Sequence, residues 1–213
     1  MKKHAGYDIL FYLVIPLIIW NYGRDLMGDY YAILLSTFPG FLYTVYRFIE
    51  QRQINITGMF VITTLLISTM VDILSPDAKA MLWNQVYLGY AFAGVFLFSM
   101  LIKKPLALYL AVDFAYLQGY ERKNSLNLFK KKEIFKLYQL LTALFVIRGI
   151  FQSYFKSWLL QAYGVDGYGQ MLIYLKLSGW IFGGLIVAGF FYTGHKINLY
   201  VKQHIQMGKG KEA

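Results

Sequence analysis

The stretch Ile9-Leu-Phe-Tyr-Leu-Val-Ile-Pro-Leu-Ile-Ile-Trp20 decides the class of fold, because it is a continuous apolar run without a charged residue. An α-helix rises about 1.5 Å per residue, so about 20 mostly apolar residues cross a hydrocarbon core about 30 Å thick. With its flanking residues, from about Tyr7 to Tyr22, this run is the first candidate for a membrane-spanning helix.

Five further segments have the same character and follow one another along the chain. Backbone polar groups inside lipid have no water to bond, so apolar segments of this length are expected to be helices. The sequence therefore predicts an all-α polytopic membrane bundle of six transmembrane helices. The other five run from about Tyr30 to Phe48, Ile56 to Leu74, Val86 to Ile102, Leu137 to Leu159 and Met171 to Tyr192.

The composition supports a membrane protein and excludes several other classes. Hydrophobic residues make up 58% of the chain and charged residues 15%, and the mean hydropathy is +0.45. Soluble domains are usually about half apolar and a quarter charged, and disordered chains are far less apolar. The chain has no cysteine, which excludes disulfide scaffolds, thiolate zinc sites and cysteine nucleophiles.

Lysine and arginine are unevenly divided between alternate loops. Of the 21 cationic residues, sixteen fall on the side of the N-terminus and two lie within spans, whereas Arg24, Lys79 and Lys156 fall on the opposite side. The positive-inside rule then predicts six crossings of the membrane with both termini in the cytoplasm. This topology accounts for the net charge of +10, so we predict no nucleic-acid partner.

The connection between the fourth and fifth spans, residues 103–136, is too long to be a simple turn. Its first part, Leu106 to Gln118, is apolar but too short to span, and we expect a helix in the inner interface with Asp113 facing water. Neighbouring cations are expected to contact anionic phospholipids, at about 1 kcal/mol each. A docking site for a protein partner is the alternative. These cations are Lys103, Lys104, Arg122, Lys123, Lys130, Lys131 and Lys132.

The predicted domain organisation follows from these segments. We expect one six-helix transmembrane domain, residues 1–200, which includes the cytoplasmic loop 103–136, followed by a basic cytoplasmic tail, residues 201–213. In the sixth span Gly179 and Gly183 form a small-xxx-small pair, which permits close helix approach within the bundle or between protomers.

Polar residues inside the spans are the candidate ligand-binding residues. A charge at mid-bilayer costs at least about 2.5–3.5 kcal/mol unless it is paired, and Arg148 and Lys176 lie within spans. Thr64, Ser68 and Asp72 share one face of the third span. The predicted set for a cation-biased outer cavity that takes a phosphate or carboxylate is Arg148, Lys176, Asp72, Gln152, Asn84 and Gln85.

A purely structural role explains the same residues. Arg148 then pairs with Asp72 or with backbone carbonyls and holds helices together, while Lys176 extends to the outer interface. Pro16 and Pro39 interrupt the first two spans, as in transporters with broken helices, although kinked structural helices are more common.

Sequence signatures of chemistry are missing. The three histidines, His4, His195 and His204, lie in or beside the predicted cytoplasmic tails and form no ligand spacing. There is no Walker A loop, dinucleotide fingerprint or nucleophile elbow. We therefore predict no metal site, no cofactor and no catalytic residue, and a chain that is not an enzyme.

Several short motifs resemble those of a known family. Lys103-Lys-Pro-Leu106 follows the fourth predicted helix, Tyr46-Arg47 precedes the third, and a sixth span rich in glycine around Gly179 ends near Tyr192 and His195. These features resemble the bacterial intracellular septation protein A family from about the second span to the sixth. The resemblance implies a small inner-membrane protein implicated in cell division and envelope synthesis, without an established reaction.

Two functions remain open from the sequence. The first is a non-enzymatic integral membrane protein of the bacterial cell envelope, which scaffolds or modulates cell-wall or membrane homeostasis or division. Its partners would be the lipid bilayer, anionic phospholipids and other membrane proteins or a second copy of the chain. The alternative is a small transporter or lipid-handling protein for an anionic ligand, with an outward-facing cavity.

Overall fold

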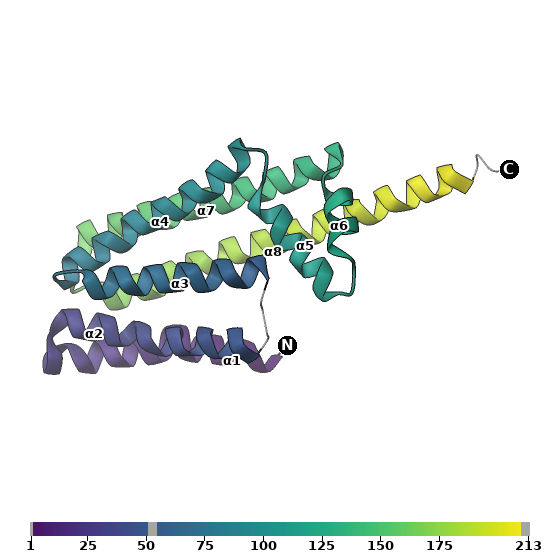
Figure 1. Cartoon of the computed structure of the whole chain (residues 1–213). Helices are drawn as coiled ribbons and strands as arrows, with labels where there is room; N and C mark the ends of the chain where they lie inside the picture. The colour runs from purple at the N-terminus through teal and green to yellow at the C-terminus, as the bar shows by residue number, and fades with distance from the viewer. Residues whose placement is uncertain (1, 51–54, 210–213) are drawn as a thin grey trace. The chain divides into compact units, whose positions relative to one another are not determined.

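The computed structural model describes residues 2–50 and 55–209, and all regular structure in this part of the chain is helical (Figure 1). The predicted all-α class is confirmed. The elements are α1 (Lys2–Ile9), a π-helical turn η1 (Leu10–Val14), α2 (Ile15–Glu50), α3 (Ile56–Leu74), α4 (Ala78–Leu101), α5 (Leu106–Leu117), α6 (Arg122–Phe129), α7 (Lys132–Tyr163) and α8 (Tyr168–Lys209).

Five helices in the described residues are long and apolar enough to cross a membrane, by length and composition. Each of them overlaps the predicted apolar segments, and the first contains the first two segments in one continuous helical stretch. The fourth predicted segment starts later than its helix, at Val86 instead of Ala78, and the sixth ends earlier, at Tyr192 instead of Gln203. A multi-pass membrane protein is compatible with this set. The five helices are Gly6–Glu50, Ile56–Leu74, Ala78–Leu101, Lys132–Tyr163 and Tyr168–Gln203.

The first of these stretches is a hairpin, because the chain reverses at Gly28. Gly28 has φ 80° and ψ 164°, a backbone conformation that is essentially restricted to glycine. The two arms, residues 6–27 and 29–50, then lie against each other. The rings of Phe11 and Tyr43 stack with centroids 4.9 Å apart, and the Tyr12 hydroxyl lies 2.5 Å from Thr44 Oγ1.

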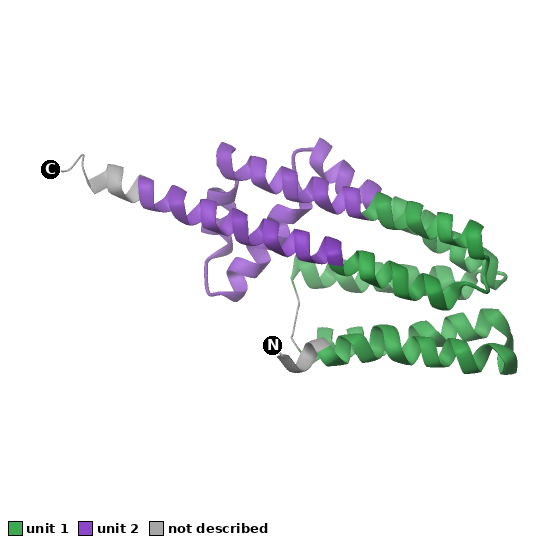
Figure 2. Cartoon of the chain, turned by 180° about the vertical axis from the view of Figure 1, so that it is seen from behind, with its two compact units in different colours: residues 1–92, 149–180 green, residues 93–148, 181–213 purple. Residues whose placement is uncertain are grey.

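The chain divides into two compact units (Figure 2). Unit 1 comprises residues 1–92 and 149–180, and its core includes Trp20, Ile33, Leu82, Leu159 and Met171. Unit 2 comprises residues 93–148 and 181–213, and its core includes Leu108, Phe129, Ile134, Tyr138 and Leu141.

In unit 2, α5 packs into the core with one face. Ala107, Leu108, Ala111 and Val112 are buried, and their spacing puts them on one side of the helix. The helix ends in a Schellman motif, in which the N–H of Tyr120 donates to the carbonyl of Ala115 across Gly119 (φ 91°). The predicted short helix is present, with its apolar face against the protein.

The prediction that Asp113 faces water is wrong. Asp113 is 1% exposed, and its Oδ1 lies 3.0 Å from Nη2 of Arg122 at the start of α6. Arg122 also lies over the ring of Tyr116, 4.8 Å from its centroid. Burying a carboxylate is costly unless an opposite charge compensates it, and Arg122 supplies the cation. A hydropathy pattern cannot reveal this pairing, because the two residues come from different helices.

The first testable prediction concerns Gly28. Gly28→Ala should destabilise the protein by about 1–3 kcal/mol, because alanine is strained at this φ and ψ even though a Cβ there would meet no atom within 4 Å. Gly94→Ala is the matched control, since Gly94 lies inside α4 and a Cβ there also has open space. Thermal unfolding in detergent should show a lower midpoint for Gly28→Ala alone, and equal midpoints for the two variants would contradict it.

Candidate functional site

Three reversals of the chain gather polar residues at one end of unit 1, which we call the turn end. They are the hairpin turn at Gly28, the α3–α4 turn at residues 75–77 and the α7–α8 turn at residues 164–167. The Tyr30 hydroxyl donates to the carbonyl of Ile73 at 2.9 Å, which joins the first two turns. Arg24 joins the first to the third through Asp166.

A polar chain of three side chains crosses from α3 to α7 at this end. Asp72 is 6% exposed, and its Oδ1 accepts a hydrogen bond of 2.6 Å from Nε2 of Gln85. Nζ of Lys156 in turn donates to Oε1 of Gln85. The amide therefore offers its donor to the carboxylate and its acceptor to the ammonium group, so both charges are stabilised without touching each other.

Local packing brings α7 close enough for this contact. A Cβ on Gly89 of α4 would collide with Oγ of Ser153 on α7, one turn before Lys156. Glycine at this position therefore allows the two helices to approach. Beside this polar chain, Nδ2 of Asn84 donates to Oγ of Ser75 at 2.9 Å. This bond fixes the side-chain amide of Asn84, the neighbour of Gln85 in the sequence.

The structure brings some of the predicted site residues together and separates others. Asp72 and Gln85 are bonded directly, and Asn84 is adjacent in sequence but bonds a different partner. Gln152 instead donates to Oγ of Ser178 on α8 at 3.0 Å. The hydroxyls of Thr64 and Ser68 bond carbonyls of their own helix.

Lys176 lies beside the hairpin. Its Nζ is 4.7 Å from the centroid of the Tyr12 ring, within the range of a cation–π interaction. Tyr12 belongs to the π-helical turn η1, and a Cβ on Gly40 would lie 2.9 Å from its ring. Glycine at position 40 therefore allows the two arms to approach each other closely beside Tyr12, the ring that Lys176 contacts.

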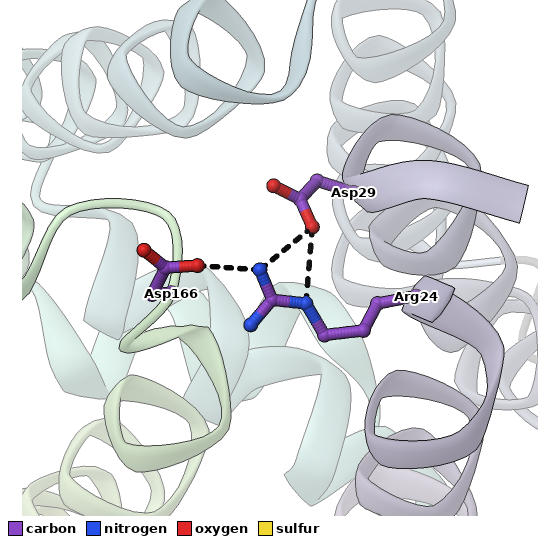
Figure 3. A network of polar contacts seen from close by, with 3 residues as sticks. All are labelled: Arg24, Asp29 and Asp166. Carbon is purple, nitrogen blue, oxygen red and sulfur yellow. Dashed lines mark hydrogen bonds and ion pairs between the residues drawn. The ribbon is translucent and has the colours of Figure 1, made fainter. Parts of the chain in front are cut away.

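Arg24 forms a second charge network, which Figure 3 shows. Its Nη2 lies 3.1 Å from Oδ1 of Asp29 and also donates to Asp166 Oδ1, and its guanidinium lies 4.8 Å from the centroid of the Trp20 ring. A planar guanidinium has enough donors to hold both carboxylates at once. The network connects the hairpin turn to the α7–α8 turn.

Lys156 and Arg24 are two cations whose partners sequence reasoning missed, because both were counted as outer-loop cations. A signal for Lys156 was present in the sequence. Gln152 and Lys156 are four residues apart, as are Arg148 and Gln152, so the three fall on one face of an α-helix. No comparable spacing points to the partners of Arg24, since Asp166 is distant in sequence.

Arg148 belongs to unit 2 and Asp72 to unit 1, so the pairing of these two residues stays a prediction.

In unit 2, Arg122 pairs with Asp113, while the other predicted lipid-contacting cations are exposed. These are Lys103, Lys104, Lys123, Lys130, Lys131 and Lys132. In residues 2–50 and 55–209, no three His, Asp or Glu side chains gather where they could hold a metal ion.

The fold and these contacts define a class of protein: all-helical, with several apolar helices of membrane-spanning length and polar side chains bonded between them. Comparison with known proteins adds no family, since no family model, no curated protein and no solved structure matches the chain. The resemblance to the septation family therefore remains a hypothesis.

The second prediction tests the polar chain. Lys156→Met should lower the free energy of unfolding by about 1–3 kcal/mol, because it removes the cation that compensates buried Asp72. The double variant Asp72→Asn with Lys156→Met should recover part of the loss, since neither charge is then isolated. Thermal unfolding in detergent measures each effect.

Lys79→Met is the matched control for this test, because Lys79 is an exposed lysine near the same turn. It should unfold at the parent temperature. If Lys156→Met is as stable as Lys79→Met, or if the losses of Asp72→Asn and Lys156→Met simply add, the two charges are not coupled through Gln85.

Proposed function

We propose that this chain is a non-enzymatic, multi-pass protein of the bacterial cytoplasmic membrane that scaffolds or modulates partners in cell-envelope homeostasis or division. Six helices cross the bilayer, and both termini and residues 103–136 lie in the cytoplasm. The reversal at Gly28 supports the sixth crossing, because each arm of the hairpin has about 22 residues and a length of about 33 Å.

One observation carries the scaffolding role: the polar side chains at the turn end of unit 1 bond one another. Asp72 and Lys156 are linked by Gln85, Arg24 holds Asp29 and Asp166, and Gln152 bonds Ser178. Side chains that bind a transported ligand must be able to release their other partners when the ligand arrives. Side chains that hold a helical bundle together have their hydrogen bonds and charges satisfied by other groups of the protein. The internal bonding therefore favours a structural bundle.

Exposed residues of unit 2 supply the surface for partners. Phe114, Leu117 and Tyr120, at the end of α5, are each 63% exposed, and exposed lysines follow them in the chain. Aromatic residues beside cations favour the interface of an anionic membrane leaflet. We therefore assign the interfacial contact to the end of α5. Membrane-protein partners and a second copy of the chain remain candidates for the same surface.

Transport or lipid handling of an anionic ligand is the second candidate. The observation that favours it is the irregular backbone beside an intramembrane cation. The π-helical turn η1 holds Tyr12 under the ammonium group of Lys176, and Gly40 follows Pro39 on the facing arm. Such irregular segments often occur at functional sites of membrane proteins.

The function can be tested in cells that lack the protein. If the chain is a scaffold, the neutral double variant Asp72→Asn with Lys156→Met should restore normal cell length and detergent resistance. Replacing Lys130, Lys131 and Lys132 with Gln should abolish that rescue, because the partner or lipid surface loses its cations. The opposite pattern, in which the double variant fails despite normal abundance and the triple variant succeeds, would support the transporter.

The third prediction concerns topology. The chain has no cysteine, so Lys79→Cys and Lys123→Cys each introduce a single thiol at an exposed position. An impermeant maleimide should label position 79 in intact cells, and position 123 only after permeabilisation, because the cation-rich side faces the cytoplasm. Labelling of position 123 but not 79 in intact cells would reverse the orientation.

A further inference from the structure

The open ends of the hairpin arms, away from Gly28, enclose a groove with a volume of about 460 Å³. Small-molecule sites in proteins usually have volumes of about 300–1,000 Å³, so the groove has a suitable size for part of a lipid. Six of the residues that line the groove determine its chemical character, and all of them come from the two arms of unit 1. They are Tyr7, Phe11, Leu42, Tyr46, Arg47 and Glu50.

The groove is amphiphilic along its length. Phe11 and Leu42 form its apolar part, Tyr7 and Tyr46 are intermediate, and Arg47 and Glu50 lie at the end of the second arm. From Leu42 to Glu50 the helix rises about 12 Å. Polarity therefore changes from hydrocarbon to charge over about the distance from an upper acyl chain to a phospholipid headgroup. Tyrosine is also the residue type that favours this boundary in membranes.

The charged end carries the guanidinium of Arg47 and the carboxylates of Asp8 and Glu50. Nη1 of Arg47 lies 3.3 Å from Oδ1 of Asp8, and its guanidinium is 5.8 Å from the centroid of the Tyr43 ring, so the cation is held at the rim. Glu50 is exposed one turn further along, and its Oε1 accepts a hydrogen bond of 3.3 Å from Tyr46. A guanidinium group suits a phosphate, and a carboxylate suits an ammonium group.

We propose that this groove binds one phospholipid with a primary-amine headgroup, from the cytoplasmic leaflet. Arg47 receives the phosphate, Glu50 receives the ammonium group, and an acyl chain lies along Phe11 and Leu42. A primary ammonium donates hydrogen bonds to the carboxylate, whereas a quaternary ammonium cannot and a glycerol headgroup brings no cation. The site rests on the proposed membrane position of the hairpin, which the labelling of positions 79 and 123 tests separately.

The experiment measures lipid binding to the purified full chain in detergent by native mass spectrometry. Phosphatidylethanolamine, phosphatidylcholine and phosphatidylglycerol with identical acyl chains are the three probes. The parent should bind one phosphatidylethanolamine about two- to five-fold more tightly than either other lipid, as expected for an exposed ion pair. Equal affinities for the three lipids would mean general lipid adhesion only and would overturn the proposal, as would a preference for phosphatidylglycerol.

Two variants separate the headgroup contacts from the groove itself. Glu50→Gln should remove the preference for phosphatidylethanolamine while leaving phosphatidylcholine binding unchanged, and Glu133→Gln, at the first turn of α7, is the control that keeps the preference. Leu42→Trp should fill the groove and weaken the binding of all three lipids without changing a charge. If Glu50→Gln keeps the preference, or if Leu42→Trp binds lipid like the parent, the groove is not the site. Correct topology labelling alongside either result would locate the failure in this proposal alone.

Discussion

A charged side chain inside a bundle of apolar helices has to find its partner within the protein, because hydrocarbon offers none. The turn end of unit 1 is built around that constraint. Asp72 enters from α3 and Lys156 from α7, and the amide of Gln85 on α4 satisfies both. Three helices are thus held together by groups that would be costly to leave alone, and Gly89 provides the close approach of α4 and α7 that the contact needs.

The same need for partners within the protein accounts for the charged residues at the hairpin turn. Gly28 reverses the chain with a conformation that other residues rarely adopt, and Arg24 and Asp29 on either side of it bond each other. Asp166 then joins Arg24 from the α7–α8 turn. A single guanidinium therefore stabilises the hairpin turn and also connects it to the α7–α8 turn. Trp20 covers one face of this guanidinium and packs against Tyr168. Trp20 therefore contacts both the polar network and the apolar core of unit 1.

Much of the fold could be predicted from hydropathy, and less of the site. Long apolar runs have few alternatives to helices, so α3, α4, α7 and α8 appear near their expected positions. Pairings between helices are a different matter, because they depend on packing that one sequence does not display. Lys156 and Arg24 were taken for loop cations, and Asp113 for a surface residue, since a charge near the end of an apolar run looks the same whether it faces water or a partner. Gln152 and Lys176 were rightly placed in helices, but their partners Ser178 and Tyr12 could not be foreseen.

The distribution of charge within unit 1 also separates two kinds of surface. At the turn end, carboxylates and cations are bonded to one another, and an incoming ligand would have to displace protein groups that already satisfy them. At the other end of the hairpin, Arg47 and Glu50 carry opposite charges on the rim of a groove that is apolar further in. An amphiphile can use such a surface while Arg47 keeps its bond to Asp8, because a guanidinium has five N–H donors and the acyl chain replaces lipid that already covers apolar residues. Binding of a phospholipid at the rim then costs the folded protein little stability. The mutually bonded charges at the turn end keep the helices together while lipids exchange at the groove.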